Sequence, residues 1–386
     1  MVNLKREREL ETMHKMLFLS IGFFVFLSAC VAEEVPDVGE ETGQVQEETE
    51  TETDIEETDE ADEITPELTV LAENLAIPWS IVKVNDIFYV SERQGTITKI
   101  ESDHVTQQTV NLDEALSNEA EAGLLGFILD PDFNNTQEAY AYYTYNGSEG
   151  PTNRIVRLKL VDNEWDEVQI LLDDVPSGAV HHGGRLAIGP DNKLYATAGD
   201  AAIPELSQDL TSLAGKILRL NLDGSLPDDN PFEDSYVYSY GHRNVQGLTW
   251  TEDGQMYASE HGNQANDEVN QIESGQNYGW PIIEGEEESA EMKTPVVTSG
   301  SQETWAPSGM DQHEETLYVA ALRGQGILEI NLSSGEINHH LTEYGRVRDV
   351  YIEEEMLYFI TNNKDGRGNP TEADDRLIRI GLSELE

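Results

Sequence analysis

The sequence of 386 residues is poor in basic residues, in cysteine and in long apolar runs. Its 23 Lys and Arg stand against 76 Asp and Glu, which gives a formal net charge of −53. Binding a polyanion requires basic groups that neutralise phosphates, so this composition excludes nucleic acid as a partner. It also disfavours direct docking of the folded body on an anionic membrane. A single cysteine, Cys30, excludes a disulfide framework and any multi-thiolate metal site.

The most apolar run lies near the N-terminus, at residues 17–29 behind a basic pair. It has the length of a signal-peptide core and is shorter than the roughly 20 residues that a membrane-spanning helix needs. It ends in Leu27–Cys30, which resembles the bacterial lipoprotein signal, where lipid is attached to the cysteine. We therefore expect residues 1–30 to be a lipoprotein signal peptide with its true start at Met13. The protein is then extracytoplasmic and held at the cell membrane only by a lipid on Cys30. An ordinary secretory signal with a chance cysteine is the alternative.

The composition changes twice after this segment. Residues 31–66 hold sixteen acidic residues and no Lys or Arg. Such a chain cannot bury enough surface to offset its conformational entropy, so we expect a disordered acidic linker that spaces a domain from the membrane. Residues 67–386 hold 57 acidic and 19 basic residues, and they form the predicted domain.

The domain repeats a two-part unit six times. The first part is a turn and a short strand with a tyrosine, and the second is a segment of alternating apolar and polar residues. The tyrosines are Tyr89, Tyr140, Tyr195, Tyr257, Tyr318 and Tyr358, and the alternating segments are 96–100, 154–158, 216–220, 268–272, 326–330 and 376–380. Alternation with period two between Asp, Asn and Gly turns indicates strands, and repeats of roughly 40–60 residues suit a propeller. We predict an all-β fold, a six-bladed β-propeller of four-stranded antiparallel blades, with a sandwich as the alternative.

Six motifs carry more polar chemistry than strands and turns require. They are residues 121–133, 181–185, 241–247, 260–281, 305–310 and 345–349. In a propeller the loops at one end of the central channel converge, so motifs from different blades can meet. Each motif alone has an ordinary explanation: a structural histidine, a hydrogen-bonded blade corner, a surface salt bridge or a tight turn.

The side chains of these motifs suggest particular tasks. His181 and His182 offer a proton acceptor near neutral pH. Arg346 and Arg348 stand two residues apart in a predicted strand, so they point to the same side and suit carboxylates. The segment 260–281 combines carboxylates with loop carbonyls, which are hard oxygen ligands suited to calcium. The candidate metal ligands there include Asp267, Glu268 and Tyr278.

Taken together and in this order, the motifs resemble those of the soluble quinoprotein sugar dehydrogenases. This is the glucose/sorbosone dehydrogenase family with its aldose sugar dehydrogenase branch. The resemblance extends from Ile77–Ser80 and Ser91–Gly95 to Arg348–Val350, and it includes Leu213–Arg219 and Asp223–Phe232. It therefore covers essentially the whole predicted domain.

The resemblance implies a six-bladed propeller that binds pyrroloquinoline quinone with Ca²⁺ and oxidises an aldose at C1 to the lactone. It implies that His181 is the general base and that Arg243 lies beside the reacting quinone oxygens. Electrons then pass to an external acceptor, a quinone or a redox protein. The absence of a Gly-rich dinucleotide turn in the sequence agrees with a hydride acceptor other than nicotinamide.

Further roles follow from the same resemblance. The residues expected to contact the cofactor are Asn244, Arg323, Arg346 and Arg348. Glu121 stands where glucose-specific members have a sugar-contacting Gln. Backbone carbonyls of Gly262 and Asn263 are expected to hold the calcium ion.

The chain departs from the family pattern at three positions. His182 replaces the usual Asn or Gln after the base, so whether His181 or His182 is the base stays open. Asn263 replaces a frequent Pro, and Glu121 replaces Gln, which puts glucose preference in doubt. The chain lacks the large insertions of the dimeric glucose enzyme, so we expect a monomer. A calcium-dependent lactonase and a non-catalytic binding propeller are the alternative functions.

Overall fold

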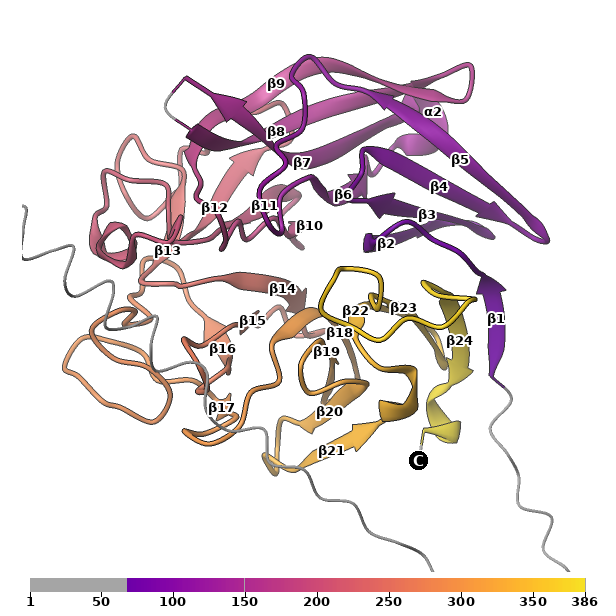
Figure 1. Ribbon diagram of the computed structural model, residues 1–386. Coiled ribbons are helices and arrows are strands. Elements are labelled where there is room, and N and C mark those ends of the chain that lie inside the picture. The colour runs from indigo at the N-terminus through magenta and orange to yellow at the C-terminus, as the bar shows by residue number, and fades with distance from the viewer. Residues whose placement is uncertain (1–67, 149, 386) are drawn as a thin grey trace, which may run out of the picture. The chain divides into compact units, whose positions relative to one another are not determined.

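The computed structural model describes residues 68–385 with the exception of residue 149 (Figure 1). The predicted signal peptide with Met13 and Cys30, and the predicted acidic linker, lie outside these residues. Within the described range, no helix combines the length and the apolar character needed to cross a membrane.

The described chain is built from short strands with very little helix. The strands are β1 Thr69–Ala72, β2 Pro78–Val84, β3 Ile87–Glu92, β4 Thr96–Glu101, β5 His104–Asn111, β6 Leu124–Leu129, β7 Glu138–Gly147, β8 Gly150–Val161, β9 Glu164–Pro176, β10 Leu186–Ile188, β11 Lys193–Ala198, β12 Lys216–Asn221, β13 Val237–Tyr240, β14 Val245–Trp250, β15 Met256–Glu260, β16 Glu268–Ile272, β17 Val297–Thr298, β18 Pro307–His313, β19 Thr316–Ala321, β20 Ile327–Asn331, β21 Ile337–His340, β22 Val347–Glu353, β23 Met356–Thr361 and β24 Leu377–Gly381. The helical turns are α2 Phe133–Thr136, η1 Pro204–Gln208, η2 Thr342–Tyr344 and η3 Leu382–Glu384.

The predicted two-part repeat is confirmed as a hairpin. Each strand that carries a repeat tyrosine, namely β3, β7, β11, β15, β19 and β23, pairs antiparallel with the next strand along the chain. Those partners, from β4 to β24, contain the alternating segments. Turn residues between the two parts reverse the chain, and alternation then places one set of side chains in the core.

The strands assemble into four-stranded antiparallel sheets. Four sheets have the orders β10-β11-β12-β13, β14-β15-β16-β17, β18-β19-β20-β21 and β1-β24-β23-β22. The remaining eight strands form one sheet, in which β2–β5 and β6–β9 are joined by a short parallel pairing of β5 with β9. Since β1 comes from the start of the described chain and β24 from its end, their pairing ties the two ends together.

The described strands fall into six groups of four, and the strand that opens each group contacts the one that opens the next group. These contacts run through β2, β6, β10, β14, β18 and β22, and β22 contacts β2 in turn. The sheets therefore follow one another in a closed order (Figure 1). An all-β chain with such an order of antiparallel sheets is consistent with a β-propeller.

The hydrophobic core lies largely between neighbouring sheets. Trp165 of β9 is completely buried, and its ring meets the edges of Tyr89 at 5.9 Å and Phe127 at 5.1 Å between centroids. Aromatic side chains of this size each contribute roughly 2–3 kcal/mol through burial. This packing fixes β2–β5 against β6–β9 within the eight-stranded sheet, so the loops of these two groups of strands are held at defined separations.

Candidate active site

The motif residues gather at one end of the sheets. Glu121, His181, Arg243 and Arg346 lie just before the first strands β6, β10, β14 and β22. In an antiparallel pair, the start of one strand lies beside the end of its partner, so loops that follow β11, β15, β19 and β23 reach the same end. Those loops carry further charged residues, beginning with Asp200. The predicted convergence of motifs from different repeats is confirmed by a shared cavity that they line.

His181 is held by a carboxylate on the next hairpin. Its Nδ1 lies 2.7 Å from Oδ1 of Asp200, whose side chain is fully buried. The same carboxylate accepts hydrogen bonds from the indole of Trp280 at 2.9 Å and from the backbone N–H of Ala202 at 2.8 Å. A carboxylate only accepts, so Nδ1 carries the proton and Nε2 presents its lone pair. His181 also has a φ of 64°, an uncommon conformation for a residue with a Cβ.

His182 is held differently. Its side chain is buried, and its Nε2 lies 2.9 Å from the carbonyl oxygen of Ala120 while Nδ1 lies 2.6 Å from the Ser177 hydroxyl. The carbonyl fixes the proton on Nε2, and Nδ1 accepts from the hydroxyl. Burial lowers the pKa of His182, so the ring stays neutral. Both of its nitrogens are therefore occupied by structural hydrogen bonds.

Arg243 lies directly against His181. Its Nη2 is 3.0 Å from the His181 Nε2, and its Nη1 is 3.3 Å from the carbonyl oxygen of His261. The guanidinium lies over the ring of Trp280, 5.4 Å from its centroid. Burial lowers the pKa of Arg243, and nearby carboxylates, first that of Asp200, counter this shift. The guanidinium remains charged, so it places a cation next to the proton acceptor.

Asn244 joins this group to the histidine motif. Its side-chain Oδ1 accepts a hydrogen bond of 3.0 Å from the backbone N–H of Gly183. Asn244 is buried and lines the same cavity as His181 and Arg243. The two motifs are thus held together by one amide.

The guanidinium groups of Arg323, Arg346 and Arg348 form a wall beside His181 and Arg243. Arg348 is buried, and within the described residues its hydrogen-bond partners are all neutral, including Gln246 Oε1 at 2.8 Å and Asn362 Oδ1 at 2.9 Å. Burial, with the nearby charge of Arg346, lowers the pKa of Arg348 to about 9. Arg346 donates to Asp365 at 2.6 Å, and Arg323 is exposed at the cavity edge.

Several buried nitrogen atoms of the cavity wall lack a hydrogen-bond partner. Within the described residues, the buried Nε atoms of Arg243, Arg346 and Arg348 have no hydrogen-bond partner, and neither has the buried Nε2 of His261. Unpaired buried donors are costly, so they mark where a ligand with several acceptors fits.

Glu121 is bound by a residue that the sequence motifs did not identify. Its Oε1 lies 2.6 Å from Nη1 of Arg367, on the loop after β23. Burial would raise the pKa of Glu121, but the Arg367 guanidinium outweighs that effect and brings the pKa to about 2. Asp200 was missed as well. The only sequence signals for these two residues are the Gly199-Asp200 step after a strand and the Gly366-Arg367-Gly368 triplet.

The candidate calcium ligands separate into two groups. Gly262 and Asn263 line the cavity that holds His181. Asp267 also lines it, but its carboxylate accepts the backbone N–H groups of Gly262 at 2.9 Å and Ala306 at 2.9 Å, so it holds the loops together. Across residues 68–385, excluding 149, no cluster of three or more His, Cys, Asp or Glu side chains suits a metal ion.

Glu268 and Tyr278 are engaged elsewhere. Glu268 accepts the backbone N–H of Gly285 at 2.7 Å and the side-chain amide of Asn270 at 3.0 Å, and burial raises its pKa to about 8. The Tyr278 hydroxyl donates to the carbonyl oxygen of Gln271 at 2.7 Å. The structure does not bring these two side chains to the cavity of His181.

The whole domain matches a known family. Residues 75–379 match the sequence profile described as glucose/sorbosone dehydrogenase. The chain belongs to this family. The family resemblance predicted from the motifs is therefore confirmed.

Several characterised and solved members are similar to the chain. Quinoprotein glucose dehydrogenase B of Acinetobacter calcoaceticus is 34% identical over 250 residues, which span 56% of this chain and 52% of that relative. Aldose sugar dehydrogenase YliI of Escherichia coli is 26% identical over 78% of this chain and 91% of its own length. The structure of a PQQ-bound aldose sugar dehydrogenase from Streptomyces coelicolor has a TM-score of 0.76 and 36% identity, over 81% of this chain and 97% of that one.

Proposed function

We propose that this protein oxidises aldose sugars at C1 to lactones, with pyrroloquinoline quinone as cofactor and Ca²⁺ beside it, on a six-bladed propeller. Membership of the glucose/sorbosone dehydrogenase family supports this function. The observation that carries it is the neutral Nε2 of His181, set between Asp200 and Arg243 in a cavity with unpaired buried guanidinium donors.

The residues of the cavity wall fit such a cofactor. Pyrroloquinoline quinone is a planar tricarboxylate, and it supplies the hydride acceptor when bound. Arg346 and Arg348 would hold its carboxylates with the donors that now lack partners, because guanidinium and carboxylate groups match in geometry and charge. Arg323 and Asn244 would complete the contacts. Backbone carbonyls of Gly262 and Asn263 would hold the calcium ion at the cavity edge.

His181 performs the proton transfer in this proposal. Its Nε2 removes the proton of the anomeric hydroxyl, and the imidazolium that forms is stabilised by the Asp200 carboxylate on the opposite nitrogen. Trp280 and Ala202 keep this carboxylate in place. A substrate hydroxyl must replace the Arg243 hydrogen bond at Nε2.

Arg243 stabilises negative charge on the reacting oxygens in this proposal. When its bond to His181 is released, its guanidinium remains within the cavity, where its Nε already lacks a partner. A fixed cation in a water-poor site stabilises negative charge that develops on the reacting oxygens. Glu121 would accept hydrogen bonds from sugar hydroxyls, since its carboxylate lines the same cavity.

The sequence supports an extracytoplasmic monomer tied to the membrane by lipid on Cys30, which delivers electrons to an external quinone or redox protein. Metabolic labelling with a fatty-acid analogue tests the anchor. We expect label on the wild-type chain and none on Cys30→Ser, and label on both would contradict the assignment.

Reconstitution is the decisive test of the activity. Cofactor-free protein, supplied with pyrroloquinoline quinone and Ca²⁺, is expected to reduce an artificial dye in the presence of aldoses. Omission of quinone is the control that separates this function from a lactonase. No dye reduction across a broad panel of aldoses would contradict the proposed function.

A further inference from the structure

Arg367 is presented to the cavity by a tightly held turn. Asp365 accepts the backbone N–H of Arg367 at 2.8 Å and the Nη2 of Arg346 at 2.6 Å. Gly368 lies so close that an added Cβ would be 2.6 Å from the carbonyl oxygen of Asn363 and 2.9 Å from Cδ of Arg346. The turn is therefore packed on Arg346, which fixes the position of the Arg367 backbone.

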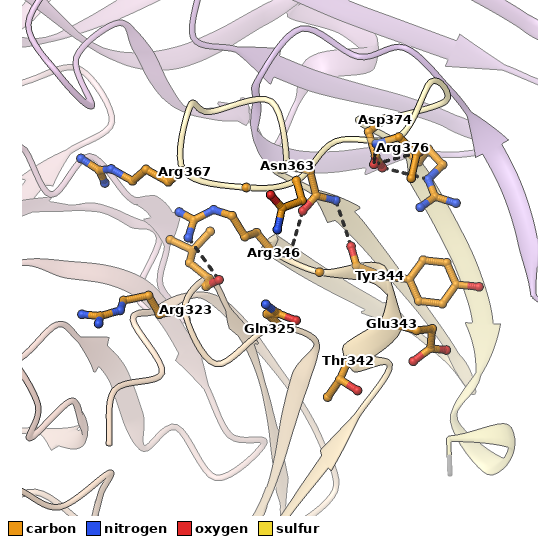
Figure 2. Close-up of a pocket in the computed structure, with 15 residues that line it drawn as sticks. Arg323, Gln325, Thr342, Glu343, Tyr344, Arg346, Asn363, Arg367, Asp374 and Arg376 are labelled. Atoms are coloured by element: carbon orange, nitrogen blue, oxygen red, sulfur yellow. Dashed lines mark hydrogen bonds and ion pairs between the residues drawn. The ribbon is translucent and has the colours of Figure 1, made fainter. Parts of the chain in front are cut away.

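The side chain of Arg367 stands where three cavities adjoin. It lines the cavity of His181, an inner one that reaches Arg348, and an outer pocket that reaches Tyr344. Figure 2 shows that Arg323, Arg346 and Arg367 extend to the same side, whereas Arg376 lies at the opposite end beside Asp374. Half of the Arg367 side chain is exposed, although one of its nitrogens holds Glu121.

Guanidinium groups line all three adjoining cavities. Their guanidinium groups belong to Arg93, Arg243, Arg323, Arg346, Arg348 and Arg367, with Arg376 at the outer end. Arg346 and Arg367 pair with Asp365 and Glu121. Across the described residues, the groups of Arg93, Arg243, Arg323 and Arg348 have no carboxylate within 4.0 Å.

Acidic side chains also line these cavities. Asp267 is bound by backbone N–H groups, and Asp374 pairs with Arg376. Glu343 lies at the outer end of the pocket, next to Thr342 (Figure 2). These guanidinium groups are concentrated around the cavities, in a chain whose overall charge is −53.

We propose that Arg367 is a specificity residue which gives this dehydrogenase a preference for aldoses that bear an anionic group away from C1, with hexuronic acids as the substrate class. This inference rests on the proposed function. His181, Glu121 and Arg367 line one cavity, and Glu121 lies 2.6 Å from the Arg367 guanidinium. Glu121 accepts from the sugar hydroxyls, and the exposed edge of Arg367 offers paired donors to a carboxylate.

Kinetics of the reconstituted holoenzyme test this preference. We expect kcat/KM for glucuronate to exceed that for glucose by about tenfold, a typical effect of one charge-assisted hydrogen bond. Glucose 6-phosphate carries the same charge sign with a different geometry, and a value above that of glucuronate would overturn the assignment to uronic acids. Oxidation of glucose without any advantage for glucuronate would overturn the inference. No oxidation of any aldose would instead overturn the proposed function.

Variants assign the effect to Arg367. In Arg367→Gln the ratio of kcat/KM for glucuronate to that for glucose should fall about tenfold. Arg367→Lys should keep part of the ratio, because it retains charge but loses the planar fork. Lys99→Gln removes one positive charge from an ion pair with Glu101 on β4, outside these cavities, and should keep the ratio. Equal loss in Lys99→Gln would mean that net charge alone decides.

Binding without turnover gives a second readout. Methyl glucuronide and methyl glucoside lack a free anomeric hydroxyl, so the holoenzyme binds them without oxidising them. Calorimetry should give a Kd about tenfold lower for the glucuronide, and this difference should vanish in Arg367→Gln. A purely structural role of Arg367 would weaken both ligands equally, which would contradict a role in specificity.

Discussion

The surroundings of His181 and His182 differ although the two residues are neighbours in the chain. His181 faces a cavity, with a buried carboxylate behind it and a guanidinium in front. His182 is enclosed by Ser177 and the backbone of Ala120, which use both of its nitrogens. In the proposed mechanism, the same side chain serves proton transfer at one position and packing at the other, because its partners determine which nitrogen is free.

The strongest test of this comparison is His181→Gln. Loss of a general base should lower kcat by about 10³-fold, since such groups contribute roughly 10²–10⁴. Binding of the quinone, followed by fluorescence titration, should stay within about threefold of wild type. His182→Gln is the matched control and should keep at least a tenth of kcat. If the two variants exchange these behaviours, the assignment of the base is wrong.

Asp200→Asn should give the next largest effect. An amide can donate to Nδ1 of His181, which would move the ring proton to Nε2 and remove the lone pair that accepts the substrate proton. We expect kcat to fall about 100-fold with little change in KM. The pH profile of kcat should change as well, and a uniform loss at every pH would point to a structural role only.

Arg348→Met probes the guanidinium wall. The Kd for the quinone should rise about 10- to 100-fold, because a charge-assisted hydrogen bond contributes roughly 1.5–3 kcal/mol. Arg219→Met provides a control, since Arg219 pairs with Asp191 and Asp229 outside the described cavities. Unchanged quinone affinity in Arg348→Met would remove this residue from the cofactor site.

The smallest expected effect is the change in the free energy of unfolding caused by His182→Gln. Burial lowers the pKa of His182 in the folded protein, so its neutral form stabilises the fold above the unfolded pKa of about 6.5. This contribution is lost as pH falls. Urea unfolding should show wild type more stable than His182→Gln by about 1–2 kcal/mol at pH 7.5, with a smaller difference at pH 5. A difference that grows on acidification would contradict a buried neutral imidazole.

Much of the fold could be predicted from the repeated strand patterns in the sequence. Tyr318 and the alternating segment after it lie in β19 and β20, which pair as the repeat predicts. The parallel contact of β5 with β9 was not predictable, because it joins residues about fifty positions apart with no local signal. The pairing of β1 with β24 was not predictable for the same reason, since it joins the start of the described chain to its end.

Those residues of the candidate site that stand in short polar motifs could be predicted from the sequence. His181, Arg243 and Arg348 were found because each stands in a dense polar segment. Glu268 and Tyr278 were grouped with the calcium loop by proximity in sequence, yet their side chains bond to Gly285 and Gln271. Sequence distance is a poor guide in a strand, where successive side chains point to opposite faces of the sheet.

The strands, the order of the motifs and the family that they indicate can be read from the sequence, because period-two alternation and turn residues act locally. Other features depend on the tertiary structure. Asp200 holds Nδ1 of His181, whereas both ring nitrogens of His182 bond to neighbouring groups. Arg367 reaches Glu121 from another loop. These contacts join hairpins far apart in the chain. Packing between whole sheets sets their distances, and no short stretch of sequence contains that information.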